Sequence, residues 1–340
     1  MIPSLFQTRN LAIDLGNNNT LLSDGESLLL SEPSFIVFDS NTNKVKAIGD
    51  QAFDIFGKNH EDLKPVQPLK WGVIADYHSA NAMIGGMVSK AAKKKTVFSR
   101  YNEIIAGVPH AATAVEQRAL RDVLEQFNSK KCSLVYEPIA AALGMGLNIR
   151  EPEGKMIVDI GGGITEIVII SLSGVAVFRS VKVAGDTFTE VIQDYLRRKY
   201  NLQVGWKTAE QTKINLGIVK ENISDIPAPA TVKGKDLMKG LPVERNIAPN
   251  EIFHVLDKPF KFVEEQIVQA LEVCPPELSA DIYQNGIYVT GGGALLRGVK
   301  ERLENSIQVP VALDPEPLTS VSRGISKVLA DPKKYKAILM

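Results

Sequence analysis

The sequence of 340 residues is long enough for two or more domains, and its 44% hydrophobic and 23% charged residues are typical of a globular protein, which excludes a disordered chain. The 39 basic and 39 acidic residues cancel, so no overall field attracts the chain to nucleic acid, and we expect no nucleic-acid partner. The two cysteines and four histidines lack the spacing of a disulfide scaffold or a zinc site.

The first element is the short apolar segment MIPSLF, which places Met1, Ile2, Leu5 and Phe6 on one side of a helical turn. Two interpretations remain open, a contact with lipid and a frayed lead-in to the first strand. The segment has neither the charged start nor the cleavage motif of a secretory signal. The longest apolar run, at 166–178, is too short and too interrupted to cross a bilayer. We therefore expect a cytoplasmic protein.

A tight β-hairpin is predicted by LAIDLGNNNTLL at 11–22. Alternating apolar residues run to Asp14, and the turn that follows contains Asn17, Asn18 and Asn19 before Thr20. Asparagine favours turns, tolerates left-handed backbone better than most residues, and adds amide donors. The turn is therefore suited to binding an anion.

Basic residues then surround two apolar ones in KAAKKKTVFSRY at 90–101, where Val97 and Phe98 form the apolar tip. Such a run is usually a solvated face. The alternative is an anionic membrane surface, to which burial of Phe98 contributes about 1.5–3 kcal/mol and each basic residue about 1 kcal/mol. Further along, Pro138 is well placed to begin a helix, so we expect Glu137 at a helix entrance.

The first hairpin pattern recurs in MIVDIGGGITEIVII at 156–170, separated from the first copy by nearly half of the chain. Gly161, Gly162 and Gly163 tolerate left-handed backbone and can direct successive N–H groups at an anion. Asp14 and Asp159 would flank the phosphates and hold Mg²⁺, largely through its waters. The alternative is two ordinary hairpins with glycine turns, but the repetition favours two similar domains with facing phosphate loops.

The remaining elements complete this outline. The apolar spacing in 187–200 and 262–272 predicts two helices packed on a core, and the polar, proline-bearing run at 221–235 predicts a loop or hairpin. A third glycine cluster lies in IYVTGGGALLRG at 287–298, between a strand and a helical stretch. A turn of this kind admits a phosphate or a flat ring against the backbone.

Together these segments resemble the actin, DnaK-type chaperone and sugar-kinase superfamily, and more narrowly the MreB family of bacterial actin homologues. The resemblance covers nearly the whole chain and is carried by AIDLGNNNT at 12–20, LKWGVIADY at 69–77, AGVPHAAT at 106–113, YEPIAAALGMGL at 136–147, VDIGGGITEIVIISL at 158–172, LRRKYNLQVGWKTAEQTKINLG at 196–217, GKDLMKGLP at 234–242, YVTGGGALLRGV at 288–299 and DPEPLTSVSRG at 314–324.

The fold that the resemblance implies is an α/β, actin-like ATPase fold, in which two related RNase H-like halves surround a nucleotide cleft and each half carries a smaller inserted subdomain. Subdomain IA is expected to comprise 1–31, 66–149 and 315–340, and subdomain IB 32–65. Subdomain IIA is expected to comprise 150–182 and 247–314, and subdomain IIB 183–246.

The resemblance also implies roles for individual residues in binding ATP and Mg²⁺. The first phosphate loop would be Asn17, Asn18, Asn19 and Thr20, the second Gly161, Gly162 and Gly163, and the turn closing over the phosphates Gly185 and Asp186. Glu210 and Lys213 would meet the ribose and adenine, and Gly291, Gly292, Gly293, Ala294 and Leu295 would form the adenosine loop. Glu137 would position the attacking water, in a catalytic group with Asp14, Asp159 and Thr165.

The function implied is a filament-forming protein that maintains rod cell shape by organising cell-wall synthesis. Its expected partners are further copies of itself, an anionic membrane surface at the inner face of the cell membrane, and the membrane proteins of cell-wall elongation. Met1, Ile2, Leu5, Phe6, Val97 and Phe98 would contact the membrane.

Two loops depart from the family pattern. The first reads GNNNT rather than GTANT, and the second has Ile164 in place of the first threonine of GGGTT. Loss of a hydroxyl near the γ-phosphate predicts slow ATP turnover, and leaves a non-hydrolysing scaffold as an alternative. A metabolite kinase of the same superfamily is a further alternative, although no additional aspartate stands out as a catalytic base.

Overall fold

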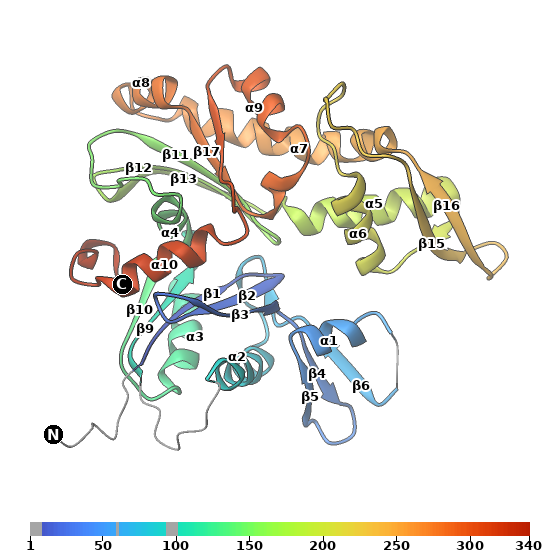
Figure 1. Cartoon of the computed structure of the whole chain (residues 1–340), viewed down its shortest axis with the longest axis horizontal. Helices are drawn as coiled ribbons and strands as arrows, with labels where there is room; N and C mark the ends of the chain where they lie inside the picture. Colours follow the sequence, from blue (N-terminus) through green and yellow to red (C-terminus); the bar gives the residue numbers. More distant parts are fainter. Residues whose placement is uncertain (1–8, 59–60, 93–100) are drawn as a thin grey trace. The chain divides into compact units, whose positions relative to one another are not determined.

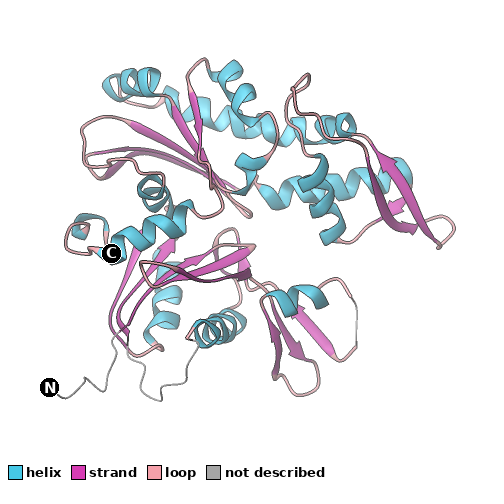
Figure 2. Ribbon diagram, in the orientation of Figure 1, coloured by secondary structure: helices cyan, strands magenta, loops and turns pink. Residues whose placement is uncertain are grey.

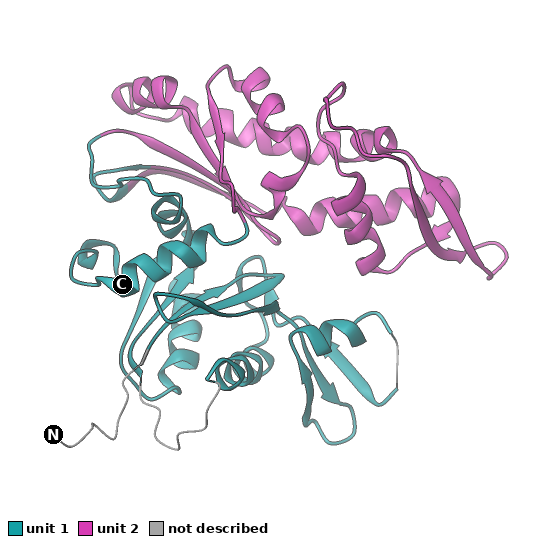
Figure 3. Cartoon of the chain, in the orientation of Figure 1, with its two compact units in different colours: residues 1–152, 170–174, 318–340 teal, residues 153–169, 175–317 magenta. Residues whose placement is uncertain are grey.

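The computed structural model describes residues 9–58, 61–92 and 101–340 (Figure 1). The chain forms two compact units, unit 1 with residues 1–152, 170–174 and 318–340, and unit 2 with residues 153–169 and 175–317 (Figure 3). The residues expected to contact a membrane lie outside the described part. Within that part, no helix has the length and apolar character needed to span a bilayer.

Unit 1 is built on a five-stranded sheet in the order β10-β9-β1-β2-β3. β1 (Arg9–Leu15) is antiparallel to β2 (Asn19–Ser23), which pairs with β3 (Leu28–Pro33). On its other side β1 is parallel to β9 (Tyr101–Val108), and β9 to β10 (Ser129–Tyr136). The parallel strands have side chains buried on both faces, as expected for strands covered by helices on each side.

Helices cover both faces of this sheet (Figures 1 and 2). α2 (Tyr77–Ala91) and α3 (Ala114–Glu125) share a core with alternate residues of β1, among them Leu11 and Ile13. α4 (Glu137–Gly144) packs closely against α10 (Ser320–Ala330), which also contacts β1 and β9.

A smaller layer in unit 1 consists of β4 (Ile36–Asp39), β5 (Val45–Ile48), β6 (Leu63–Val66) and α1 (Asp50–Ile55), with its own apolar cluster that includes Phe35 and Val37. The short hairpin of β7 (Leu69–Lys70) and β8 (Val73–Ile74) leads from this layer towards α2. Trp71 and Gly72 form its two-residue turn, both with positive φ, which matches the backbone of a type I′ turn.

Unit 2 has a second five-stranded sheet, in the order β13-β12-β11-β17-β18. Its strands are β11 (Lys155–Ile160), β12 (Thr165–Ser171), β13 (Gly174–Val181), β17 (Ile287–Thr290) and β18 (Val311–Leu313). The strand order matches that of unit 1, because in each unit the hairpin strands lie on one side of the central strand and two parallel strands lie on the other. The internal repeat predicted from the two hairpins is thus confirmed at the level of whole sheets.

The helices of unit 2 are α5 (Gly185–Tyr200), α6 (Trp206–Leu216), α7 (Pro249–Glu272), α8 (Pro276–Asn285) and α9 (Val299–Ile307). The helices predicted over 187–200 and 262–272 lie within α5 and α7 and are confirmed. Phe188 and Phe260 meet in the core of the unit. A small sheet, β14-β15-β16, is formed by β14 (Leu202–Gln203), β15 (Ala230–Asp236) and β16 (Pro242–Ile247).

Candidate functional site

In unit 1 the predicted hairpin turn is held by polar side chains from outside the motif. The hydroxyl of Ser34 donates to the carbonyl of Gly16 at 2.7 Å, and its N–H donates to the carbonyl of Asn18 at 2.9 Å. The amide of Gln67 donates to the carbonyl of Asn17 at 2.9 Å. Three successive turn carbonyls are therefore directed into the protein, which suits a turn whose N–H groups receive an anion.

Ser34 also fixes the end of this loop. Its oxygen lies 2.9 Å from the hydroxyl of Thr20, and since the single Ser34 proton is used on Gly16, Thr20 is the donor of this pair. Sequence reasoning missed both Ser34 and Gln67. They lie 18 and 50 residues from the carbonyls that they bind, and no local pattern marks them.

Although asparagine and glycine tolerate left-handed backbone, neither hairpin turn uses it at these positions. None of the residues of Asn17–Asn19 or Gly161–Gly163 has a positive φ. Glycine is needed instead for close approach, because a Cβ on Gly16 would lie 2.7 Å from the carbonyl oxygen of Asn19, and one on Gly161 would lie 3.0 Å from that of Ile164. The glycine at the start of each turn is therefore selected by a contact rather than by its dihedral freedom.

Glu137 lies at the carboxyl edge of the unit 1 sheet, close to the end of β1, in which Asp14 is the penultimate residue. It is the first residue of α4 and is followed by Pro138, as predicted. A Cβ placed on Gly107 of β9 would lie 3.1 Å from Cγ of Glu137, so the two residues are in contact range. β1 and β9 are parallel with Ile13 opposite Ala106, which places Asp14 beside Gly107. The carboxyl edge of such a sheet is the usual place for a ligand in α/β folds.

In unit 2, Asp159 occupies the equivalent position at the end of β11. Burial raises its pKa from the ordinary 3.8 to about 6. Gly291 (φ 80°) is adjacent, and any side chain there would overlap Oδ1 of Asp159. Gly291 begins the third glycine cluster, which continues as the 3₁₀ turn Gly292–Leu295. The structure therefore brings the second and third glycine clusters to one edge of one sheet.

The N-terminus of α5 meets the second glycine loop directly. The N–H of Gly185 donates to the carbonyl of Gly161 at 3.0 Å, and that of Asp186 donates to the carbonyl of Gly162 at 2.8 Å. Thr165 is fully buried at the start of β12, where its hydroxyl donates to the carbonyl of Val183 at 2.7 Å. This hydroxyl therefore ties β12 to the segment that leads into α5.

Glu210 and Lys213 are one turn apart on α6 and form an ion pair of 2.7 Å. The ammonium of Lys213 also donates to the carbonyl of Gly185 at 2.9 Å and to the hydroxyl of Thr189 at 3.1 Å. Thr189 was not predicted from the sequence. The pair thus touches the first turn of α5, the same turn that contacts the glycine loop.

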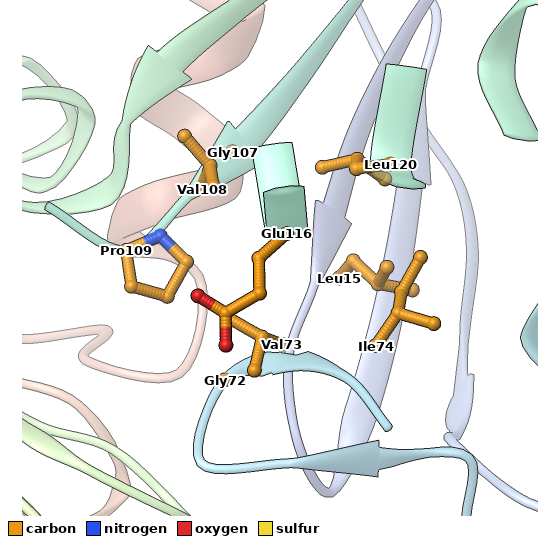
Figure 4. A pocket seen from close by; sticks show the side chains of 9 residues that line it. All are labelled: Leu15, Gly72, Val73, Ile74, Gly107, Val108, Pro109, Glu116 and Leu120. Carbon is orange, nitrogen blue, oxygen red and sulfur yellow. The ribbon is translucent and has the colours of Figure 1, made fainter. Parts of the chain in front are cut away.

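A small apolar pocket lies in unit 1, at the carboxyl ends of β1 and β9 (Figure 4). Its cavity volume is about 10 Å³, room for about one water molecule and far below the roughly 300–1,000 Å³ of typical small-molecule sites. The carboxylate of Glu116 points into it but accepts 2.7 Å hydrogen bonds from the N–H and hydroxyl of Thr113, as part of a capping box. Oε2 of Glu116 is therefore engaged in the cap of α3. Its lining residues are Leu15, Gly72, Val73, Ile74, Gly107, Val108, Pro109, Glu116 and Leu120.

Comparisons with known proteins give a consistent result. The family model described as MreB/Mbl protein matches residues 8–337. The cell shape-determining protein Mbl of Bacillus subtilis is 37% identical over 327 residues, covering 94% of this chain and 96% of Mbl. The cell shape-determining protein MreB of Escherichia coli strain K12 is 36% identical, covering 95% of this chain and 93% of that protein.

Solved structures agree with these relatives. MreB5 of Spiroplasma citri, in a crystal structure bound to AMPPNP, is 34% identical and superposes with a TM-score of 0.91 over 97% of this chain and 98% of its own. MamK in a double helical filament is 21% identical with a TM-score of 0.79, covering 96% of this chain and 99% of its own, and supports the fold alone. The fold is therefore actin-like, with two related halves, and the chain belongs to the MreB/Mbl family.

Proposed function

We propose that this protein binds ATP, assembles into filaments and acts as a cytoskeletal determinant of cell shape. The observation that carries the proposal is the repeat of one arrangement in both units, an aspartate at the end of the central strand followed by a glycine-closed hairpin turn. Its support comes from MreB5 of Spiroplasma citri, which resembles this chain closely and was crystallised with AMPPNP and with ADP.

In the proposed nucleotide site each unit contributes one phosphate loop, Asn17–Thr20 from unit 1 and Gly161–Gly163 from unit 2. The first turn of α5 adds N–H groups and the positive end of a helix, which favour an anion. Glu210 accepts from the ribose hydroxyls, and Gly291–Leu295 provides a backbone surface for the adenosine. Glu137 orients the attacking water, in a reaction in which positioning and charge stabilisation dominate.

Mg²⁺ fits the chemistry of these residues. A carboxylate such as Asp159, whose pKa burial raises to about 6, is stabilised in its ionised form by a nearby cation. Asp14 and Asp159 would hold the ion, mostly through its waters. When bound, Mg²⁺ neutralises charge on the β- and γ-phosphates.

Self-assembly is supported by exposed apolar side chains and opposite charges at two ends of unit 2 (Figure 1). These are the β15–β16 tip, residues 236–241, and the α8 end, residues 272–285. At the tip, the side chains of Leu237, Met238 and Leu241 are exposed, Met238 by 80%. The carboxylate of Asp236 accepts the N–H groups of Met238 at 2.8 Å and of Lys239 at 3.0 Å, which fixes the shape of the tip. Ordered, exposed apolar residues of this kind mark a contact surface.

The α8 end is complementary in character. Val273 and Tyr283 are exposed there, Tyr283 by 72%, and residues 272–285 include Glu272, Glu277 and Asp281 but no lysine or arginine. The hairpin instead carries an excess of basic residues: Lys233, Lys235, Lys239 and Arg245 against Asp236 and Glu244. A contact between the tip of one copy and the α8 end of the next joins different surfaces, and such a contact propagates into a filament.

The filament is further proposed to lie at the inner face of the cell membrane, held by Met1, Ile2, Leu5, Phe6, Val97 and Phe98 and working with membrane proteins of cell-wall elongation. One such anchor is weak, and repetition along a filament multiplies it. The support for this part is the sequence pattern and the cell-shape role named for the relatives.

High-speed pelleting with and without Mg-ATP tests the proposal. We expect pelleting to require nucleotide. Lys239→Glu alone or Glu277→Lys alone should weaken it, and a double variant that carries both substitutions should restore it. Lys258→Glu, at an exposed position on α7, serves as the control. Absence of pelleting in every nucleotide state would contradict the proposal.

One alternative function, a scaffold that does not hydrolyse ATP, is suggested by Ile164. Ile164 occupies the loop position where a hydroxyl is expected, which favours a scaffold that binds ATP without hydrolysing it. Phosphate release from assembled protein separates the two functions, because only an ATPase releases phosphate as filaments form.

A further inference from the structure

A continuous chain of hydrogen bonds runs from α6 to the glycine loop. The ammonium of Lys213 donates to the carbonyl of Gly185 at 2.9 Å. The N–H of Gly185 in turn donates to the carbonyl of Gly161 at 3.0 Å, and the next N–H, of Asp186, donates to that of Gly162 at 2.8 Å. The lysine therefore holds the peptide units on which the proposed phosphate loop rests.

All three N–H donors of the Lys213 ammonium have acceptors within unit 2. They are the carbonyl of Gly185, the hydroxyl of Thr189 at 3.1 Å and Oε2 of Glu210 at 2.7 Å. An ammonium has three donors and no acceptor, so none remains for a ligand in this arrangement. Lys213 is only 9% exposed and Thr189 is fully buried, which keeps water from replacing these contacts.

Glu210 links this group to the surface. Its Oε2 contacts both Lys213 and the hydroxyl of Thr189, whereas Oε1 has no hydrogen bond within the described residues. Its side chain is also more exposed than that of Lys213. A nearby carboxylate neutralises the ammonium, so the lysine acts on the α5 turn through directed hydrogen bonds rather than as a charge attracting phosphate.

We propose that Lys213 is a positioning residue that braces the phosphate-binding loop through Gly185, while Glu210 alone meets the nucleoside. This inference rests on the proposed function for the identity of the ligand, a nucleotide, whereas the hydrogen bonds of Lys213 are independent of it. A lysine that contacts the base or ribose contributes equally to every adenine ligand. A lysine that braces the loop contributes only where phosphates are bound.

The first experiment needs no nucleotide. Amide hydrogen exchange is measured on nucleotide-free Lys213→Met, with Lys258→Met as a matched control that removes an exposed lysine from α7. We expect exchange in 183–187 to be about tenfold faster in Lys213→Met, with α7 unchanged as the report of intact folding. Unchanged exchange in 183–187 overturns the brace, whether or not the protein binds nucleotide.

The second experiment compares ligands with and without phosphates. By calorimetry, Lys213→Met should bind Mg-ATP and Mg-ADP about tenfold more weakly, with adenosine affinity changed less than twofold. Equal losses for adenosine and Mg-ATP would make Lys213 a nucleoside ligand and overturn the proposal. Wild-type protein that binds no nucleotide would refute the proposed function, and the exchange measurement would still decide the role of Lys213.

Lys213→Gln separates hydrogen bonding from charge. Its amide keeps two donors for Gly185 and Glu210 while losing the ammonium, and it leaves no uncompensated cation. We expect its exchange in 183–187 to stay within about threefold of wild type. A Lys213→Gln variant as impaired as Lys213→Met would assign the effect to charge and contradict a brace built on hydrogen bonds.

Discussion

Replacing Asp159 by asparagine should stabilise the protein in the absence of nucleotide and metal. The pKa of this carboxyl is about 6 in the folded protein against an ordinary 3.8, a difference worth about 3 kcal/mol. The folded state therefore binds the proton more tightly than the unfolded state. Its contribution to stability is fully present below pH 3.8 and is lost as the pH rises through about 6. Above that pH the ionised, buried carboxylate carries the full cost.

The assay is urea denaturation of wild type and Asp159→Asn in the presence of EDTA, at pH 7.5 and at pH 5. At pH 7.5 we expect the variant to have a free energy of unfolding higher by up to about 3 kcal/mol, and at pH 5 by about half of that. Asp225→Asn is the control, since its side chain is 92% exposed. A variant that is less stable than wild type at pH 7.5, or a gain that does not depend on pH, would refute the reasoning.

Three further predictions address the loops and the membrane. Ile164→Thr restores a hydroxyl to the second loop and should raise the rate of phosphate release by assembled protein, and an unchanged rate would show that the residue does not limit turnover. Ser34→Ala removes the donor to Gly16 and the acceptor of Thr20, and should lower the free energy of unfolding by about 1–3 kcal/mol and weaken Mg-ATP binding. Combining Phe98→Ala with deletion of residues 1–6 should abolish nucleotide-dependent pelleting with anionic liposomes, whereas pelleting at the wild-type level would exclude these anchors.

Much of the fold could be predicted because its signals are local. Each hairpin is indicated by an alternating strand, an aspartate and a turn within about a dozen residues. The recurrence of this pattern indicates two related halves. Pro138, the second residue of α4, likewise indicates that the helix begins at Glu137. The matching strand orders of the two sheets are the structural form of that repeat.

What sequence reasoning missed depends on contacts between distant residues. Gln67 and Ser34 reach the first loop from elements whose own sequences look ordinary. Asparagine and glycine tolerate left-handed backbone, but the first turn does not use it and instead depends on the close approach of Gly16 to the carbonyl of Asn19. The four-subdomain boundaries and the membrane-contacting residues stay predictions.

The packing of α10 on the unit 1 sheet has a consequence for folding during translation. Unit 1 begins with β1, yet one face of β1 and β9 is covered by residues 320–330, and α4 also packs against this late helix. During translation the first half therefore emerges with an apolar sheet face that its own preceding sequence cannot cover. Synthesis of all of unit 2 intervenes before the covering helix leaves the ribosome. Until then this apolar face stays uncovered, and truncation before residue 320 should leave the first half unable to fold completely even though most of its residues are present.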